Sequence, residues 1–170
     1  MKFKNRDNKQ YQTTCGKTIW HSRNVAVCVC LIRTSPTDPT RIQVLAVKRG
    51  SAVTHEGKYC FPCGYLDWDE SVPMAAVREV YEETGLEIKS EDLDFSGIDS
   101  NPEKFSQNVT VHFELYYMGT EDPNLNNCGE NEATEVKWFN FEDAEKLPWA
   151  FDHKERLGSL VKNCSIEVPK

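Results

Sequence analysis

Apolar positions along the chain fall into stretches whose spacing predicts β-strands. Residues 25–32 are apolar at every position, which is typical of a central strand covered on both faces, although this pattern alone also fits a buried helix. After a turn at residues 34–39, residues 42–49 predict a partner strand that forms a hairpin with the first. Residues 109–117 alternate apolar and polar side chains, which indicates a strand with one face in a core. Residues 136–141 predict a further strand.

The clearest helical segment is predicted from about Val72 to Thr84. Ser71 can cap its start, the first turn tolerates Pro73, and Gly85 supplies the left-handed residue that commonly ends a helix. At 100° per residue, one side of this helix is expected to pack, and it holds Pro73, Val77, Val80, Tyr81 and Thr84. The opposite side carries small and acidic residues, namely Ala75, Ala76, Glu79, Glu82 and Glu83.

The three glutamates of this helix suggest a cation site. Like charges three and four residues apart repel one another on a helix, and a divalent ion would reverse that cost. Hard ions such as Mg²⁺ prefer oxygen ligands and often share their remaining positions with substrate phosphates. Ala75 and Ala76 leave room for a neighbouring loop or a ligand to approach. The alternative interpretation is a solvated acidic face.

The order of these segments predicts an α/β fold in a single domain. Two shorter helices are expected at residues 142–147 and 153–162, so that helices cover a mixed sheet. Residues 1–18 are polar and lack a periodic apolar pattern, which predicts a poorly ordered lead-in or a peripheral strand before a domain at residues 19–170.

Composition and charge narrow the possible classes. With 170 residues, 39% of them hydrophobic, the chain is expected to build one core. A net charge of −7 argues against coating a nucleic-acid backbone, so phosphate chemistry here would need positive charge from another source. The longest apolar run has eight residues and the N-terminus lacks the apolar core of a secretory signal, so we expect no membrane association and a cytoplasmic location. Seven cysteines, an odd number, also fit a reduced compartment.

Residues 64–86 resemble the signature of the Nudix hydrolase family. That signature reads Gly, five residues, Glu, seven residues, Arg-Glu, an aliphatic residue, any residue, Glu-Glu, any residue, Gly and an aliphatic residue. Every fixed position matches, at Gly64, Glu70, Arg78, Glu79, Val80, Glu82, Glu83, Gly85 and Leu86. One departure is Cys63, where the family usually has a second glycine.

The resemblance implies an α/β/α sandwich with a mixed sheet and a divalent-metal-dependent pyrophosphatase. The expected reaction cleaves a phosphoanhydride in a nucleoside diphosphate linked to another moiety, with Mg²⁺ or Mn²⁺ as cofactor. By the resemblance, the Gly64 carbonyl, Glu79, Glu82 and Glu83 bind the metal, while Glu70 and Arg78 brace the loop and the helix. Residues 149–153 are similar to a segment of Nudix proteins that act on ADP-ribose, which favours ADP-ribose or a related nucleotide derivative.

The mechanism also needs a carboxylate that takes a proton from the attacking water. In the family this base comes from the helix or from a later loop, so the candidates are Glu79, Glu82, Glu130, Glu132 and Glu135. Glu132 is the first choice, and the alternative is that the loop acids are ordinary surface residues. Arg78 is expected to orient carboxylates rather than bind phosphate.

Basic residues near the signature could contact substrate phosphates, or they could be solvated surface residues; these are Arg23, Lys48, Arg49 and Lys58. Cys60 and Cys63 have the spacing of half a zinc knuckle, but no second pair follows, so neither zinc nor redox chemistry is expected there.

A second class of function is a catalytically inactive Nudix-fold module that senses nucleotides or regulates other proteins. The intact glutamates favour the enzyme. The expected partner is a nucleotide-type small molecule, with no nucleic acid except an RNA 5′ end, and a homodimer is an open alternative.

Overall fold

The computed structural model describes residues 8–104 and 107–163, with side chains in the last helix as far as residue 160. Its helices are α1 (Val72–Thr84), α2 (Phe141–Ala144) and α3 (His153–Asn163), with a 3₁₀ turn at Ser90–Asp92. Its strands are β1 (Lys9–Gln12), β2 (Thr18–His21), β3 (Asn24–Thr34), β4 (Ile42–Arg49), β5 (Tyr59–Cys60), β6 (Cys63–Tyr65), β7 (Asp94–Asp99), β8 (Asn108–Tyr116) and β9 (Ala133–Asn140).

The main sheet is mixed, as the sequence predicts. Its central path runs β5-β4-β3-β8-β7, while β6 pairs with β3 and β9 pairs with β4. Strands β3 and β8 run parallel over nine residue pairs from Asn24↔Asn108 to Ile32↔Tyr116, and the other pairings in this sheet are antiparallel. The predicted hairpin of β3 with β4 is therefore confirmed, with Ile32 opposite Val44.

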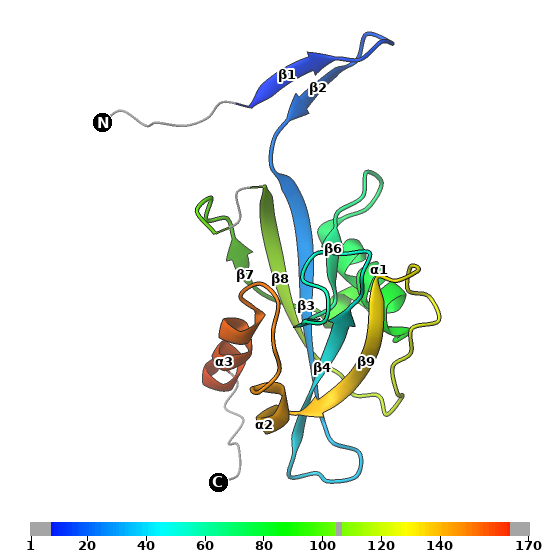
Figure 1. Ribbon diagram of the computed structural model, residues 1–170, viewed down its shortest axis with the longest axis vertical. Helices are drawn as coiled ribbons and strands as arrows, with labels where there is room; N and C mark the ends of the chain where they lie inside the picture. The colour runs from blue at the N-terminus through cyan, green and yellow to red at the C-terminus, as the bar shows by residue number, and fades with distance from the viewer. Residues whose placement is uncertain (1–7, 105–106, 164–170) are drawn as a thin grey trace, which may run out of the picture.

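Helices cover both faces of this sheet, which confirms the α/β/α sandwich. Strand β3 contributes to both cores because successive side chains point to opposite faces. Val27, Val29 and Leu31 pack in the core beneath α1, with Ala75, Ala76 and Val80 of the helix. Cys28, Cys30 and Ile32 face the other core, which includes Phe141 of α2 and Leu157 and Leu160 of α3. In Figure 1, α1 and α3 accordingly lie on opposite sides of the central strands.

The predicted elements with strong periodicity are found at or near their expected bounds. Strand β4 and helix α1 match the prediction at both ends, and β3, β8 and α3 agree to within two residues. Strand β9 begins earlier than predicted, at Ala133, and α2 is shorter, ending at Ala144. The predictions missed β5 and β6, which are only two and three residues long, and β7, a strand with mostly exposed side chains.

The described part of the N-terminal segment forms a small antiparallel hairpin. Strands β1 and β2 pair only with each other, with Lys9 opposite His21. Figure 1 shows this hairpin standing away from the main sheet. Among the described residues, no helix has the length and hydropathy needed to cross a membrane.

The side of α1 that packs is only partly the predicted one. Val80 and Thr84 are fully buried, as predicted. Tyr81 is 44% exposed, whereas Ala75 and Ala76 are fully buried and Glu79 is only 9% exposed. The two alanines allow close approach, so the helix turns its small and acidic side toward the sheet and β6. Ser71 occupies the N-cap position without a side-chain hydrogen bond, and Gly85 ends the helix in the left-handed region with φ 70°.

The start of α3 is anchored by a buried histidine. His153 is 4% exposed, and its Nδ1 accepts a hydrogen bond of 3.0 Å from the backbone amide of Phe61. Its Nε2 lies 3.7 Å from the Cys28 sulfur. Burial lowers the pKa of His153 to about 3, so the imidazole is neutral in the folded protein.

This neutral histidine predicts a pH dependence of stability. The unfolded chain binds a proton at this residue below about pH 6.5, whereas the folded chain does not, so stability falls as pH decreases. In His153→Asn, the amide oxygen can still accept from Phe61, but no group titrates. We expect the unfolding free energy of the wild type to fall faster than that of the variant by up to about 1.4 kcal/mol per pH unit. Urea denaturation between about pH 6 and pH 4 measures the two slopes, and equal slopes would contradict the assignment.

Candidate active site

Helix α1 lies against β6 through a contact that only a glycine permits. A Cβ atom placed on Gly64 would overlap the carboxylate of Glu79. Cys63 and Gly64 pair with β3, opposite Cys28 and Val27, so the main sheet fixes β6 while its other side meets the helix. The carboxylate of Glu79 is therefore held in the narrow space between the helix and the sheet.

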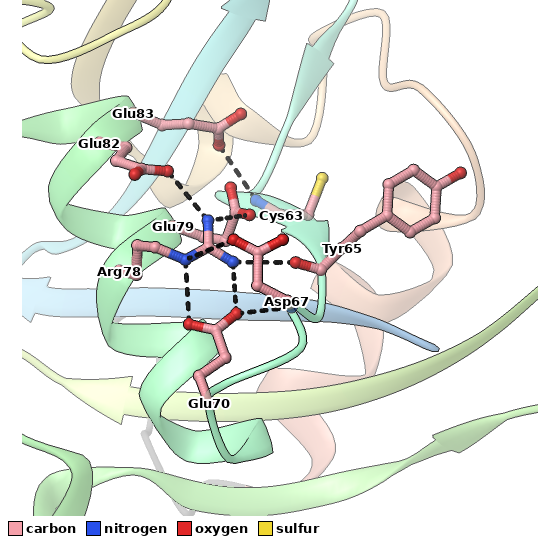
Figure 2. A network of polar contacts seen from close by, with 8 residues as sticks. All are labelled: Cys63, Tyr65, Asp67, Glu70, Arg78, Glu79, Glu82 and Glu83. Atoms are coloured by element: carbon pink, nitrogen blue, oxygen red, sulfur yellow. Dashed lines mark hydrogen bonds and ion pairs between the residues drawn. The ribbon is translucent and has the colours of Figure 1, made fainter. Parts of the chain in front are cut away.

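Arg78 is the central residue of the polar network in this space (Figure 2). Its guanidinium donates two hydrogen bonds to the Glu70 carboxylate, from Nε at 3.0 Å and from Nη2 at 2.6 Å. Nη1 donates to Glu79 at 2.7 Å and to Glu82 at 3.0 Å, and Nη2 also donates to the carbonyl oxygen of Tyr65 at 2.9 Å. Arg78 thus joins the loop before α1, the helix itself and β6.

The charges of this network favour its ionised form. Hydrogen bonds to the carboxylates, chiefly Glu70, raise the pKa of Arg78, so its charge is permanent. The hydrogen bond from Arg78 lowers the pKa of Glu70, which also accepts from the backbone amide of Asp67 at 2.9 Å. A bidentate contact of this kind fixes geometry as well as charge.

Glu79 is buried and Glu83 is half-buried on the helix. Burial raises the pKa of Glu79 despite its contact with Arg78. Burial also raises the pKa of Glu83 well above its usual range, and the neighbouring Cys60 adds to this effect. Glu83 accepts a hydrogen bond of 3.0 Å from the backbone amide of Cys63. Both carboxylates therefore lie where an added positive charge would stabilise their ionised forms.

The carboxylates are suitable donor atoms for a hard divalent cation, but they do not converge on a single point. Three carboxylates beside a glycine carbonyl are the oxygen ligands that Mg²⁺ and Mn²⁺ prefer. However, within residues 8–104 and 107–163, no three histidine, cysteine, aspartate or glutamate side chains converge to form a metal-binding cluster. Arg78 engages both Glu79 and Glu82. Because the Glu82 side chain is 46% exposed, it has room to turn from Arg78 toward an ion.

A cavity of about 440 Å³ opens beside Gly64. Its walls come from β3, β6, β8, the loop after β4 and the start of α3. Among the basic residues predicted to meet phosphates, Arg49 lines this cavity. Its Nε donates to the carbonyl oxygen of Thr54 at 2.6 Å, and its guanidinium lies 5.1 Å from the centre of the Phe151 ring. Arg49 is thus held in one orientation at the wall of a cavity that Gly64 of β6 also lines.

The other predicted phosphate ligands lie outside the residues that line this cavity. Arg23 donates to the carbonyl oxygens of Ser100, at 2.7 Å, and Asn108, which ties together the ends of β7 and β8. Lys48 lies 5.8 Å from the centre of the Tyr59 ring, and Lys58 is exposed.

The acidic loop before β9 approaches the end of α1. Asn124 donates its amide hydrogen to the carbonyl oxygen of Thr84 at 2.8 Å. Burial raises the pKa of Cys128, and the charges of Glu83 and Glu132 raise it further. Cys128 is therefore near both glutamates, so this loop lies near the acidic end of the helix. Glu132 is exposed.

The carboxylate of Glu135 is bound by Tyr59 and Lys137. It accepts a hydrogen bond of 2.7 Å from the Tyr59 hydroxyl, which lowers its pKa, and it pairs with Lys137 at 3.5 Å.

Sequence reasoning did not identify the other residues of the cavity wall. Asp99, His112 and Asp152 line the cavity but come from three elements far apart in the chain. Two signals pointed towards them: the polar face of β8, whose alternation indicated one face outside a core, and the similarity of residues 149–153, which include Asp152, to a segment of Nudix proteins that act on ADP-ribose. The structure shows that part of the β8 face is covered, because His112 is 3% exposed.

Comparisons with known proteins agree with this fold. The family model for the NUDIX domain matches residues 22–159. An ADP-ribose pyrophosphatase from Methanocaldococcus jannaschii is 31% identical over 122 residues, which cover 71% of this chain and 66% of that protein. An NAD-capped RNA hydrolase NudC from Pectobacterium carotovorum is 26% identical over 147 residues, which cover 79% of this chain and 52% of that protein. The chain thus spans between half and two thirds of the length of these two relatives.

Solved structures show the same fold at low sequence identity. The NUDIX domain of Shewanella oneidensis NrtR, in complex with ADP ribose, has a TM-score of 0.71 and 21% identity, and the match covers 89% of this chain and 92% of that one. A bifunctional NMN adenylyltransferase/ADP ribose pyrophosphatase from Francisella tularensis, with AMP and a Mn ion, has a TM-score of 0.66 and 20% identity. That match covers 84% of this chain and 42% of the other.

The network around Arg78 predicts a large loss of stability in Arg78→Gln. Glutamine cannot span the three carboxylates, so Glu79 is left buried without its charged partner. We expect a loss of about 2 kcal/mol or more. The matched control is Arg41→Gln, which removes an exposed ion pair with Asp38 and is expected to cost less than about 1 kcal/mol. Chemical denaturation measures the loss of stability in both variants. Equal losses would show that Arg78 does not stabilise the fold through its contacts with the carboxylates.

The contact between Gly64 and Glu79 predicts that Gly64→Ala is destabilising. The added methyl group must displace the Glu79 carboxylate or the β6 backbone, at a cost of about 1–3 kcal/mol. Gly158→Ala is the control, because its Cβ would meet no atom within 4 Å and alanine favours the helix by about 0.5–1 kcal/mol. Denaturation curves are expected to shift in opposite directions. A neutral Gly64→Ala variant would contradict the close contact.

Proposed function

The chain belongs to the Nudix family, and from that premise we propose that it is a pyrophosphatase that requires Mg²⁺ or Mn²⁺. Its substrate is a nucleoside diphosphate linked to another moiety. The observation that carries the proposal is a pair of carboxylates, buried Glu79 and half-buried Glu83, held against β6 beside a cavity of about 440 Å³. A cavity of this size is in the range of small-molecule sites. The matched residues 22–159 support a Nudix domain at residues 19–170, preceded by a polar segment at 1–18.

The proposed metal ligands are the Gly64 carbonyl oxygen, Glu79, Glu82 and Glu83. Their support is the hard oxygen donor set and the raised pKa values of Glu79 and Glu83, which a nearby cation would lower. When bound, a divalent ion supplies the positive charge that a pyrophosphate needs and lowers the pKa of a bound water.

Arg78 acts as a positioning residue in this proposal. It orients Glu79 and Glu82 through Nη1 and links them to Glu70, so it is engaged by carboxylates rather than by substrate phosphate. Arg49 faces the cavity and is the proposed phosphate-binding residue. Lys48, Lys58 and Arg23 have less support because none of them lines the cavity.

Glu132 remains the proposed general base, whose carboxylate accepts a proton from the attacking water. Its support is the position of its loop beside the C-terminal end of α1. Glu79 and Glu82 are the alternatives on the helix. Glu135 has less support, because Tyr59 and Lys137 already engage its carboxylate.

ADP-ribose is the first substrate to test. Similarity to an ADP-ribose pyrophosphatase supports it, and the relatives named NAD-capped RNA hydrolase keep an RNA 5′ end in the panel. A homodimer and a cytoplasmic location remain predictions.

One observation keeps the alternative of a non-catalytic nucleotide sensor in view. Arg78 engages one oxygen of Glu79 and one oxygen of Glu82, so it competes with a metal ion for these carboxylates. A panel of nucleotide derivatives with Mg²⁺, Mn²⁺ or EDTA separates the two classes. Metal-dependent turnover supports the enzyme, whereas tight binding without turnover supports the sensor.

The metal assignment predicts that Glu82→Gln and Glu83→Gln each lower kcat by about 100-fold or more. Each change removes a charged ligand but keeps the shape of the side chain, so the fold is expected to stay intact by circular dichroism. Glu87→Gln is the matched control, because Glu87 is exposed just beyond the end of α1. Steady-state hydrolysis of ADP-ribose with Mg²⁺ measures the effect. Full activity in either ligand variant would refute the assignment.

A further inference from the structure

The cavity beside Gly64 has a second, acidic side that the proposed metal chemistry does not use. Its floor includes Asn108, Thr110 and His112, which alternate along β8 and so share one face of the sheet. Asp99, at the end of β7, and Asp152, just before α3, lie in the wall next to them. Gly64 and Arg49 belong to other parts of the wall. The cavity therefore combines an expected phosphate-binding region with an acceptor-rich region.

The two aspartates form a fixed carboxyl pair. Asp99 accepts a hydrogen bond of 2.6 Å from Nη2 of Arg156, and its Oδ2 lies 3.3 Å from Nε2 of His112. The Asp152 carboxyl group lies close enough to Asp99 that each group affects the pKa of the other. Burial raises the pKa of Asp152, and the charge of Asp99 adds to this effect. Arg156 and His112 thus hold Asp99 in place beside Asp152.

His112 adds an unsatisfied polar atom to this region. The residue is 3% exposed, and its Nδ1 has no hydrogen-bond partner within the part of the chain that the structure describes. Burial lowers the pKa of His112 to about 4, so the imidazole is neutral and has one acceptor nitrogen and one donor nitrogen. A buried polar atom without a partner is costly. A ligand that brings hydroxyl groups into the cavity would satisfy it.

We propose that Asp99, Asp152 and His112 bind the vicinal hydroxyl groups of a ribosyl unit of the substrate. Carboxyl and imidazole acceptors suit hydroxyl donors, whereas a phosphate would be repelled by the carboxyl pair, because Arg156 is already paired with Asp99. This inference rests on the proposed function, since it takes the pyrophosphate to lie at Gly64 and Arg49. The uneven charge of the cavity then sets the orientation of the substrate, with its sugar toward β8 and α3.

The test compares ADP-ribose with analogues that lack a ribosyl diol. One analogue lacks the vicinal 2- and 3-hydroxyls of the terminal ribose, and the other lacks the 2′- and 3′-hydroxyls of the adenosine ribose. Equilibrium binding is measured by calorimetry with EDTA present, and kcat and KM are measured with Mg²⁺. For the wild type, we expect one of the two analogues to bind about tenfold or more weakly than ADP-ribose.

Two variants assign this discrimination to the carboxyl pair. Asp152→Ala is expected to bind ADP-ribose as weakly as the wild type binds the discriminated analogue, with no further loss when the hydroxyls are removed. Asp152→Asn keeps the size of the side chain and is expected to lose part of the discrimination while folding normally. Asp143→Ala is the control, because Asp143 lies on α2 with its side chain 61% exposed. In turnover experiments the Asp152 variants are expected to raise KM more than they lower kcat.

The possible outcomes separate this inference from the proposed function. If ADP-ribose binds no better than either analogue, or if both Asp152 variants keep full discrimination, the inference is wrong whether or not ADP-ribose is hydrolysed. If the wild type binds ADP-ribose with the expected discrimination but never hydrolyses it, the catalytic proposal is wrong and the inference stands. An analogue with hypoxanthine in place of adenine tests the base. If the hypoxanthine analogue binds more weakly and neither diol analogue does, the adenine amino group occupies this region and the inference is overturned.

Discussion

The burial of carboxylates between α1 and β6 is the constraint on which the rest of the site depends. Burying charge is costly unless it is paired, and three features of this chain make it possible. Ala75 and Ala76 let the helix approach the sheet, Gly64 leaves space for the Glu79 carboxylate, and Arg78 supplies a paired positive charge. The same contacts hold the acidic side of the helix at the edge of a cavity. The stability of the fold and the chemistry of the site therefore use the same residues.

The mixed sheet gives the cavity two regions of different character. The parallel pairing of β3 and β8 brings the polar face of β8 beside β6. One part of the wall then carries Gly64 and Arg49, and another carries the Asp99–Asp152 pair with neutral His112. A substrate with an anionic centre and a hydroxylated end matches this division.

The sequence predicted the elements whose signals are local and repeated. Helix α1 has a proline near its start and a glycine at its end, and β3 is apolar on both faces, so their types and bounds followed from residue patterns. Strands β5 and β6 could not be predicted in this way, because they are short and their pairing depends on β3 and β4. The buried side of α1 was predicted only in part: Val80 and Thr84 are buried as expected, but the hydrophobic pattern did not show that Ala75 and Ala76 would meet the sheet. Motif spacing identified Gly64 and the glutamates of the Nudix signature, whereas Asp99 and Asp152 have no shared local pattern and meet only in the folded chain.

Equilibrium binding of Mn²⁺, followed by electron paramagnetic resonance, tests the central claim most directly. If the carboxylates beside Gly64 form a cation site, the folded wild-type protein binds Mn²⁺ saturably, Mg²⁺ displaces it, and ADP-ribose changes the spectrum of the bound ion. If Arg78 instead permanently satisfies these carboxylates, the folded protein shows no saturable Mn²⁺ binding with or without ADP-ribose, and the account is contradicted.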